Sequence, residues 1–137
     1  MMVRRILQED NTGCGLACVA MVAGTSYAKV KAVAIRLGIA TKRPPYYTSA
    51  KHLSMLMREL GLRSSKERML SGWKSFSAPS IIAINLDKKG NWHWVVYVPS
   101  ADGGYVLDPK KVIKSVRRTD FSRMRPRSYI PMLRAAA

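Results

Sequence analysis

The chain has 137 residues, of which 24 are lysine or arginine and 8 are aspartate or glutamate, so its formal net charge is +16. This is the length of one ordinary domain, and we expect a single domain over residues 1–137 whose core needs neither disulfides nor metals. The longest apolar run, Leu16 to Ala23, is too short to cross a bilayer, and no signal-peptide core precedes it. We therefore expect a cytoplasmic protein, or one exported without a cleaved signal peptide.

The positive charge predicts attraction to polyanions or acidic partners. It is concentrated after Pro109, where a single acid, Asp120, stands among Lys110, Lys111, Lys114, Arg117, Arg118, Arg123, Arg125 and Arg127. No zinc-finger spacing, aromatic RNA-binding signature or helix-turn-helix pattern accompanies these residues, which argues against a nucleic-acid-binding protein. The simplest alternative is a solvated basic face.

The first predicted helix covers residues 13–23. Apolar residues recur at helical spacing from Cys14 onward, and Gly24 provides an end. Asn11 and Thr12, just before this segment, are residue types that cap helices, so we expect one of them to cap this helix.

Two further helices are predicted before the middle of the chain. One begins at the capping residue Ser26 and ends at Gly38, with an apolar stripe along one side. The other begins at Ser49 and ends at Gly61. Residues 62–70 indicate a short strand and a turn.

The second half of the chain is predicted to form strands. The apolar run 81–86 is typical of a buried strand, and a turn connects it to residues 92–98, which are rich in β-branched and aromatic side chains. Residues 105–108 continue this antiparallel meander. Residues 129–133 are predicted to be an edge strand, because Pro131 lacks the N–H group that a central strand needs. Helices followed by a meander make an α+β fold.

Cys14 lies where a polar, glycine-bearing turn gives way to the first predicted helix. The N-terminus of a helix carries unpaired N–H groups and positive potential, which favour the thiolate, the nucleophilic form of cysteine. We therefore interpret Cys14 as a nucleophile and Cys18, one turn later, as a core residue. A disulfide between them is not expected, because residues four apart on a helix keep their Cβ atoms about 5–6 Å apart.

His93 is the first candidate for a base that acts on Cys14. The other histidine, His52, falls opposite the apolar stripe of the third helix, where we expect a surface residue. Asp108 ends the next strand of the meander, so its carboxylate can lie beside the imidazole and select its tautomer. Taken separately, His93 can also be interpreted as a buried core histidine, and Asp108 as an ordinary turn residue before Pro109. Gln8 can supply an amide N–H to an oxyanion, together with the backbone N–H of Cys14.

Three segments resemble papain-like cysteine peptidases that remove double-glycine leader peptides, best known as the N-terminal domain of bacteriocin-exporting transporters. They are Gln8-Glu9-Asp10 with Cys14-Gly15-Leu16-Ala17-Cys18, then His93-Trp94-Val95-Val96-Tyr97, then Val106-Leu107-Asp108-Pro109. The resemblance runs from about Ile6 to Pro131 and implies a papain-like peptidase fold, with N-terminal helices packed on an antiparallel sheet.

By this resemblance, Cys14 would be the nucleophile, His93 the general base and acid, Asp108 its orienting partner and Gln8 the oxyanion-hole residue. The reaction would be hydrolysis of a peptide bond through a thioester, after a Gly-Gly pair, with neither a cofactor nor a metal. No transporter sequence follows, so a stand-alone peptidase is expected.

The implied partner is a peptide or protein substrate whose leader binds as an amphipathic helix, often with acidic residues. The basic surface of this chain motivates the hypothesis that its own substrate is acidic. Related domains that lack the cysteine bind peptides without cleaving them. A peptidase-like fold that serves as a peptide-binding or protein-binding module without catalysis is therefore the alternative function.

Overall fold

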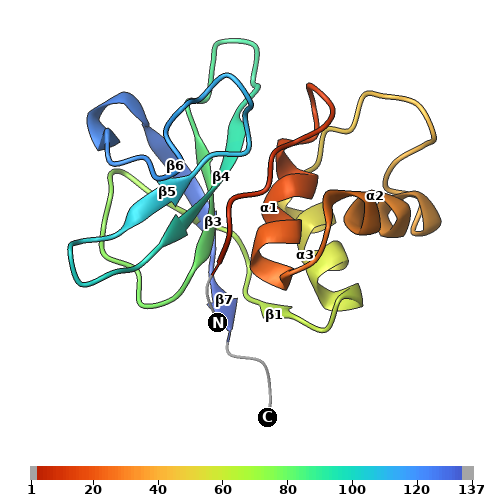
Figure 1. Cartoon of the computed structure of the whole chain (residues 1–137), viewed down its shortest axis with the longest axis horizontal. Helices are drawn as coiled ribbons and strands as arrows, with labels where there is room; N and C mark the ends of the chain where they lie inside the picture. Colours follow the sequence, from red (N-terminus) through yellow and green to blue (C-terminus); the bar gives the residue numbers. More distant parts are fainter. Residues whose placement is uncertain (1–2, 134–137) are drawn as a thin grey trace.

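The computed structural model describes residues 3–133. In this part of the chain three α-helices lie together on one side of a β-sheet (Figure 1). They are α1 (Cys14–Ala23), α2 (Tyr27–Arg36) and α3 (Ala50–Glu59). The predicted α+β arrangement, with helices packed on antiparallel strands, is confirmed.

The main sheet has five antiparallel strands in the order β2-β6-β3-β4-β5. Their bounds are β2 (Arg68–Met69), β3 (Ser80–Ile84), β4 (His93–Val98), β5 (Tyr105–Leu107) and β6 (Pro126–Ile130). A two-stranded ladder joins β1 (Arg63–Ser64) to β7 (Met132–Leu133). One short 3-10 helix, η1 (Phe121–Arg123), precedes β6.

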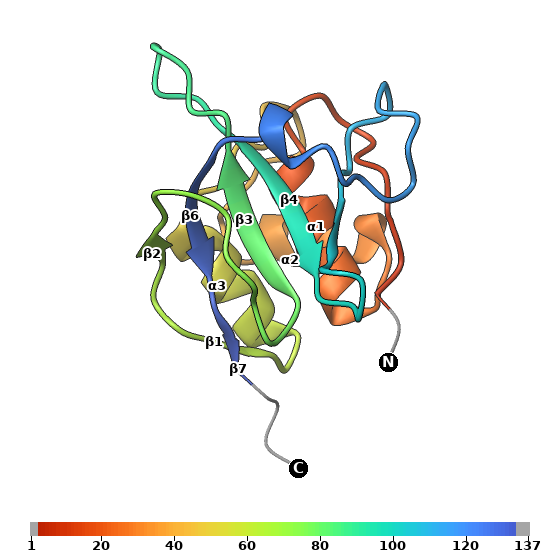
Figure 2. The same cartoon turned by 90° about the vertical axis from the view of Figure 1, so that its left-hand side faces the viewer.

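Strand β3 is buried along its whole length because both faces of the sheet are covered. Ile81 and Ala83 point into the core between the sheet and the helices, whereas Ile82 and Ile84 belong to a second apolar cluster on the opposite face. Figure 2 views the molecule from that second face, with the helices behind the sheet. A strand covered on both sides needs apolar residues at every position, which explains the unbroken apolar run in the sequence.

Helix α1 is the central helix of the core. Every residue from Gly15 to Val22 is buried, because the helix packs against α2, α3 and strand β4 at once. A helix surrounded on all sides is apolar all round, so its sequence shows no strong amphipathic stripe. The helix ends at Gly24, whose left-handed backbone (φ 67°) is the conformation that glycine adopts without strain.

The start of α1 differs from the prediction that Asn11 or Thr12 caps it. The N-cap residue is Gly13, and no side chain caps this end of the helix. The hydroxyl of Thr12 instead accepts a hydrogen bond from the backbone N–H of Tyr46, at 2.7 Å. Thr12 therefore holds the segment that leads to α3, and the first N–H groups of α1 are left without a capping side chain.

The predicted caps of the other two helices are confirmed. The Ser26 hydroxyl accepts a hydrogen bond from the third residue of α2, and the Ser49 hydroxyl accepts one from the backbone N–H of His52 in α3. The prediction of one edge strand over residues 129–133 is wrong. Pro131 interrupts this segment, and β6 lies inside the sheet between β2 and β3 while β7 pairs with β1.

Among residues 3–133, no single helix combines the length and the apolar character that crossing a membrane requires. Taken together, α1 and α2 are long and apolar enough by length and composition alone, but their axes differ by 112°.

Two glycines flank Cys14, and each allows a close approach that a side chain would block. A Cβ atom on Gly13 would lie 2.0 Å from the Tyr27 hydroxyl oxygen, and one on Gly15 would lie 1.9 Å from Thr48 Oγ1 and 3.0 Å from Leu53 Cδ2. The start of α1 therefore sits in direct contact with α2 and with the segment that enters α3.

We predict that Gly15→Ala lowers the free energy of unfolding by about 1–3 kcal/mol, because the added methyl group forces Thr48 and Leu53 apart. Urea unfolding followed by circular dichroism measures this effect. Gly72→Ala is the matched control, since a Cβ atom there meets nothing within 4 Å. A Gly15→Ala midpoint equal to that of the wild-type protein would contradict the packing described here.

Candidate active site

Cys14 and His93 come from opposite halves of the molecule and meet where α1 begins and β4 begins. The sulfur of Cys14 accepts a hydrogen bond from the backbone N–H of Trp94, at 3.5 Å. The indole N–H of Trp94 donates to the carbonyl oxygen of Thr48, at 3.0 Å. Because one residue of β4 bonds to both α1 and the segment before α3, the position of the sulfur relative to the sheet is fixed.

The imidazole of His93 connects the sulfur to a buried carboxylate. Its Nε2 lies 2.7 Å from Oδ1 of Asp108, and the ring is also within hydrogen-bonding reach of Cys14. Because Nε2 is engaged by the carboxylate, Nδ1 is the nitrogen left to face the thiol. The side chain of His93 is 24% exposed and that of Asp108 only 1%, so the site opens to solvent on the histidine side.

The pKa of His93 is raised to about 9. Burial alone would lower the pKa of the ring, but the hydrogen bonds to Asp108 and Cys14 and the charges of both partners outweigh it. At neutral pH the ring therefore holds its proton, and His93 is an imidazolium between two groups that can carry negative charge.

The carboxylate of Asp108 has three hydrogen-bond donors. Oδ1 accepts from His93 and from the backbone N–H of Lys110, at 2.9 Å, and Oδ2 accepts from Nη1 of Arg118, at 2.8 Å. Burial would raise the pKa of Asp108, but the bonds to His93, Lys110 and Arg118 lower it below its usual value. The carboxylate is thus kept ionised in a buried position.

A solvated basic face is one alternative that the sequence allows for the segment after Pro109, but Arg118 does not belong to such a face. Its side chain is 11% exposed and bonds to two carboxylates, Asp108 and Asp120. A signal was present in the sequence, since Asp120, the single acid of the basic segment, stands two residues after Arg118.

Sequence reasoning also missed Arg5. Its guanidinium donates to the carbonyl oxygens of Asp108 at 2.7 Å, Ile113 at 2.7 Å and Lys110 at 3.0 Å. The backbone N–H of Gln8 adds a bond to the carbonyl oxygen of Pro109, at 2.9 Å. The segment that precedes α1 therefore holds the loop that carries Asp108.

The buried side chain of Gln8 lies in the turn before α1. Its amide nitrogen donates to the carbonyl oxygens of Asp10 and Asn11, each at 2.9 Å. Its oxygen, Oε1, has no hydrogen-bond partner among the described residues. Both amide N–H groups are thus used inside the turn, and donation to an oxyanion requires one of them to turn outward. The oxyanion role of Gln8 stays a prediction.

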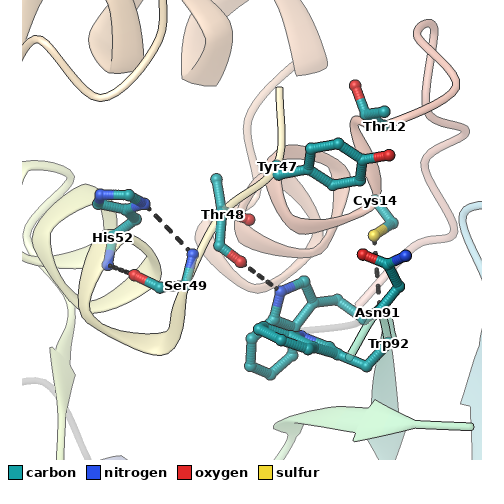
Figure 3. Close-up of a pocket in the computed structure, with 9 residues that line it drawn as sticks. Thr12, Cys14, Tyr47, Thr48, Ser49, His52, Asn91 and Trp92 are labelled. Carbon is teal, nitrogen blue, oxygen red and sulfur yellow. Dashed lines mark hydrogen bonds between the residues drawn. The ribbon is translucent and has the colours of Figure 1, made fainter. Parts of the chain in front are cut away.

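A pocket of about 280 Å³ opens beside Cys14 (Figure 3). Its walls come from both halves of the molecule: Thr12, Tyr47, Thr48, Ser49 and His52 on the helical side, and Asn91, Trp92 and Trp94 on the sheet side. The predicted surface residue His52 is half-buried and has two structural contacts. Its Nδ1 accepts a hydrogen bond from the Ser49 N–H at 3.2 Å, which completes a capping box, and its ring lines this pocket.

Cys18 is fully buried in the core of α1, and both cysteines are free thiols. Burial, followed by the nearby Cys14 and Asp108, raises the pKa of the Cys18 thiol, so it remains neutral. Among residues 3–133, no group of three or more His, Cys, Asp or Glu side chains is placed to hold a metal ion.

A cysteine at the start of a buried helix, a histidine at the start of one antiparallel strand and an aspartate just after the next strand define the papain-like class of fold. The sequence profile of the Peptidase C39 family matches residues 3–124. The chain belongs to this family of cysteine peptidases. No curated protein matches the chain significantly.

Two solved structures have the same fold. The peptidase domain of Streptococcus ComA, a bi-functional ABC transporter involved in a quorum sensing pathway, superposes with a TM-score of 0.66 at 19% identity, over 96% of this chain and 98% of that one. A double glycine motif protease from an AMS/PCAT transporter, in complex with the leader peptide, superposes with a TM-score of 0.64 at 22% identity, over 96% of this chain and 91% of that one.

We predict that the free energy of unfolding declines as pH rises from about 6.5 to about 9, because folding raises the pKa of His93 from its ordinary value of 6.5 to about 9. The contribution of His93 to the free energy of unfolding is complete below its unfolded pKa and is lost above its folded pKa. Urea unfolding at a series of pH values measures it. His93→Gln should remove the decline and His52→Gln should keep it; a decline that survives His93→Gln would contradict the assignment.

Proposed function

We propose that this protein is a cysteine peptidase in which Cys14 attacks a peptide carbonyl and His93, oriented by Asp108, transfers the protons. The observation that supports this proposal is the convergence of the three groups: the Cys14 sulfur within reach of the His93 ring, and the ring 2.7 Å from a buried carboxylate. Membership of the Peptidase C39 family supports the same chemistry.

In the proposed reaction, His93 already holds on Nδ1 the proton that the Cys14 thiol has given up, and the sulfur attacks as a thiolate and forms a bond to the carbonyl carbon of the substrate. The imidazolium then protonates the leaving amine as the C–N bond breaks, which leaves a thioester on Cys14. A water molecule then gives one proton to His93 and attacks the thioester. The C–S bond breaks, the acid product leaves, and the thiolate beside a protonated His93 is restored. A His93 pKa of about 9 suits this cycle, because the ring is a charged acid at neutral pH.

The oxyanion would form beside the N-terminus of α1. The backbone N–H of Cys14 belongs to the first turn, whose N–H groups have no partner within the helix. Gln8 would supply the second donor after one amide N–H leaves the carbonyl oxygen of Asp10 or Asn11. Removal of one such donor typically slows catalysis by about a hundredfold to a thousandfold.

We propose a peptide substrate cleaved after a double-glycine motif. The solved neighbours support this class, since one is described as a double glycine motif protease bound to its leader peptide. The pocket beside Cys14 would receive the substrate, with Trp92 (38% exposed) and Tyr47 (65% exposed) offering aromatic faces on its two sides.

Cys14→Ala is predicted to lower the rate of peptide hydrolysis by more than about 10⁴-fold, because the nucleophile is removed. Hydrolysis of a double-glycine peptide followed by mass spectrometry measures the rate, and labelling with a thiol-reactive probe that competes with the peptide reports on the same residue. Cys18→Ala is the matched control and should keep both hydrolysis and labelling. Unchanged hydrolysis in Cys14→Ala would refute the proposal.

We further propose that the leader carries acidic residues, because the surface that would meet it belongs to a chain with a formal net charge of +16. We predict that the KM for an acidic leader rises with salt, whereas the KM for a charge-neutralised leader of the same sequence changes little. Steady-state kinetics at increasing sodium chloride concentrations test this. Equal KM values for the two leaders at every salt concentration would remove the idea.

One observation favours the second candidate, a peptide-binding module without catalysis. Both N–H groups of the Gln8 amide are engaged within its own turn, so the donor side of a side-chain oxyanion hole is occupied. The two candidates differ in one result: a binding module holds the leader peptide equally well with Cys14→Ala and releases no product with either protein.

A further inference from the structure

We propose that Arg118 is a positioning residue of this site, which holds the second carboxylate oxygen of Asp108 and limits how strongly that carboxylate binds the proton of His93. The kinetic part of this inference rests on the proposed peptidase function, whereas its electrostatic part is a property of the folded protein alone.

The two oxygens of the Asp108 carboxylate bind different partners. Oδ1 forms a hydrogen bond with Nε2 of His93, at 2.7 Å, and Oδ2 accepts one from Nη1 of Arg118, at 2.8 Å. The side chain of Asp108 is 1% exposed, so water cannot replace the guanidinium at Oδ2 without opening the site. A carboxylate held at both oxygens cannot rotate away from the imidazole.

Arg118 is itself held in place by backbone and side-chain contacts. Its N–H and carbonyl groups pair with Val106 of β5, at 2.8 Å and 2.9 Å. Its Nε and Nη2 atoms donate to the two carboxylate oxygens of Asp120, at 2.9 Å and 2.8 Å. The guanidinium is a rigid planar fork, so fixing one side of it on Asp120 aims Nη1 at Asp108.

The charges around the Asp108 carboxylate show how Arg118 acts on His93. The groups that act on the Asp108 carboxylate are His93 from β4, the backbone N–H of Lys110 and the Arg118 guanidinium, which Asp120 partly neutralises. The neutral Cys18 thiol of α1 lies close enough for the charge of Asp108 to raise its pKa. Arg5 reaches only the backbone carbonyl of Asp108. A cation bonded to the carboxylate reduces the negative potential at the imidazole. Without Arg118, the full charge of Asp108 would act on His93 and raise the pKa of the ring further.

Arg117 provides a matched comparison. It is the neighbouring residue and carries the same charge, but it is exposed, and its guanidinium lies 4.4 Å from the centre of the Tyr105 ring. Replacing Arg117 by glutamine changes the net charge of the protein by the same amount as replacing Arg118. A difference between the two variants therefore reports on the contact with Asp108 and not on overall charge.

The test is an NMR titration of the His93 ring in the full chain, with His52→Gln used to assign the signals of the two histidines. In the wild-type protein the pKa of His93 is about 9. We expect Arg118→Gln to raise it by about one unit and Arg117→Gln to leave it unchanged. An unchanged or lowered value in Arg118→Gln, or the same rise in both variants, would overturn the proposal.

Arg118→Lys keeps the measurement decisive if Arg118→Gln does not fold. A lysine keeps the charge but cannot bridge two carboxylates, so the pKa of His93 should rise by less than in Arg118→Gln and remain above the wild-type value. The result that counts against a role for the guanidinium is a His93 pKa in Arg118→Lys equal to the wild-type value. The variant must unfold at the same urea concentration as the wild-type protein.

Kinetics supply the second readout. We expect Arg118→Gln to lower kcat/KM by about tenfold to a hundredfold and to move the alkaline limb of its pH profile upward, as the His93 pKa moves. A uniform loss with an unshifted profile marks Arg118 as merely structural. If the wild-type protein cleaves no double-glycine peptide, the proposed function fails, while the titration of His93 still decides the role of Arg118.

Discussion

The contact between the first residue of α1 and the first two residues of β4 is the constraint on which the rest of the structure depends. Helix α1 is buried on all sides, so its N-terminus has one possible position against the sheet. That position places the Cys14 sulfur on the backbone N–H of Trp94 and within reach of the His93 ring. The same packing that builds the core therefore assembles the thiol and the imidazole.

The second constraint is the buried charge of Asp108. An ionised carboxylate with 1% exposure is costly unless donors surround it, and here the donors come from distant parts of the chain. His93 lies on β4, Lys110 lies in the loop after β5, and Arg118 lies on the segment that leads to η1. Arg5 adds three bonds that tie this loop to the segment before α1. Together these bonds connect the N-terminal segment, the sheet and the basic segment.

Local sequence signals predicted the helices and the central strands well. The serine caps of α2 and α3, the glycine at the end of α1 and the apolar run of β3 are short-range features that act through neighbouring residues. Motif spacing also predicted that Cys14, His93 and Asp108 would lie together. Their catalytic roles remain predictions.

What the sequence could not show depends on contacts between distant residues. Arg5 leaves no local pattern, because its bonds reach residues more than a hundred positions away. The nearby Asp120 is a local signal for Arg118, but the contact with Asp108 depends on where the fold places that carboxylate. The place of β6 inside the sheet follows from its pairing with β3, which Pro131 alone could not reveal. The place of His52 in the pocket lining depends on how the start of α3 packs beside Trp92 and Trp94 of the sheet half, which no local pattern of the sequence shows.

The central claim is that the Cys14 sulfur and the His93 ring share one site, and a comparison of the His93 titration in the wild-type protein and in Cys14→Ala tests it most directly. The hydrogen bond and the charge of Cys14 both raise the pKa of His93. The account therefore predicts that Cys14→Ala lowers the pKa of His93 below its wild-type value of about 9. An unchanged pKa would contradict it, because the sulfur would then have no contact with the imidazole.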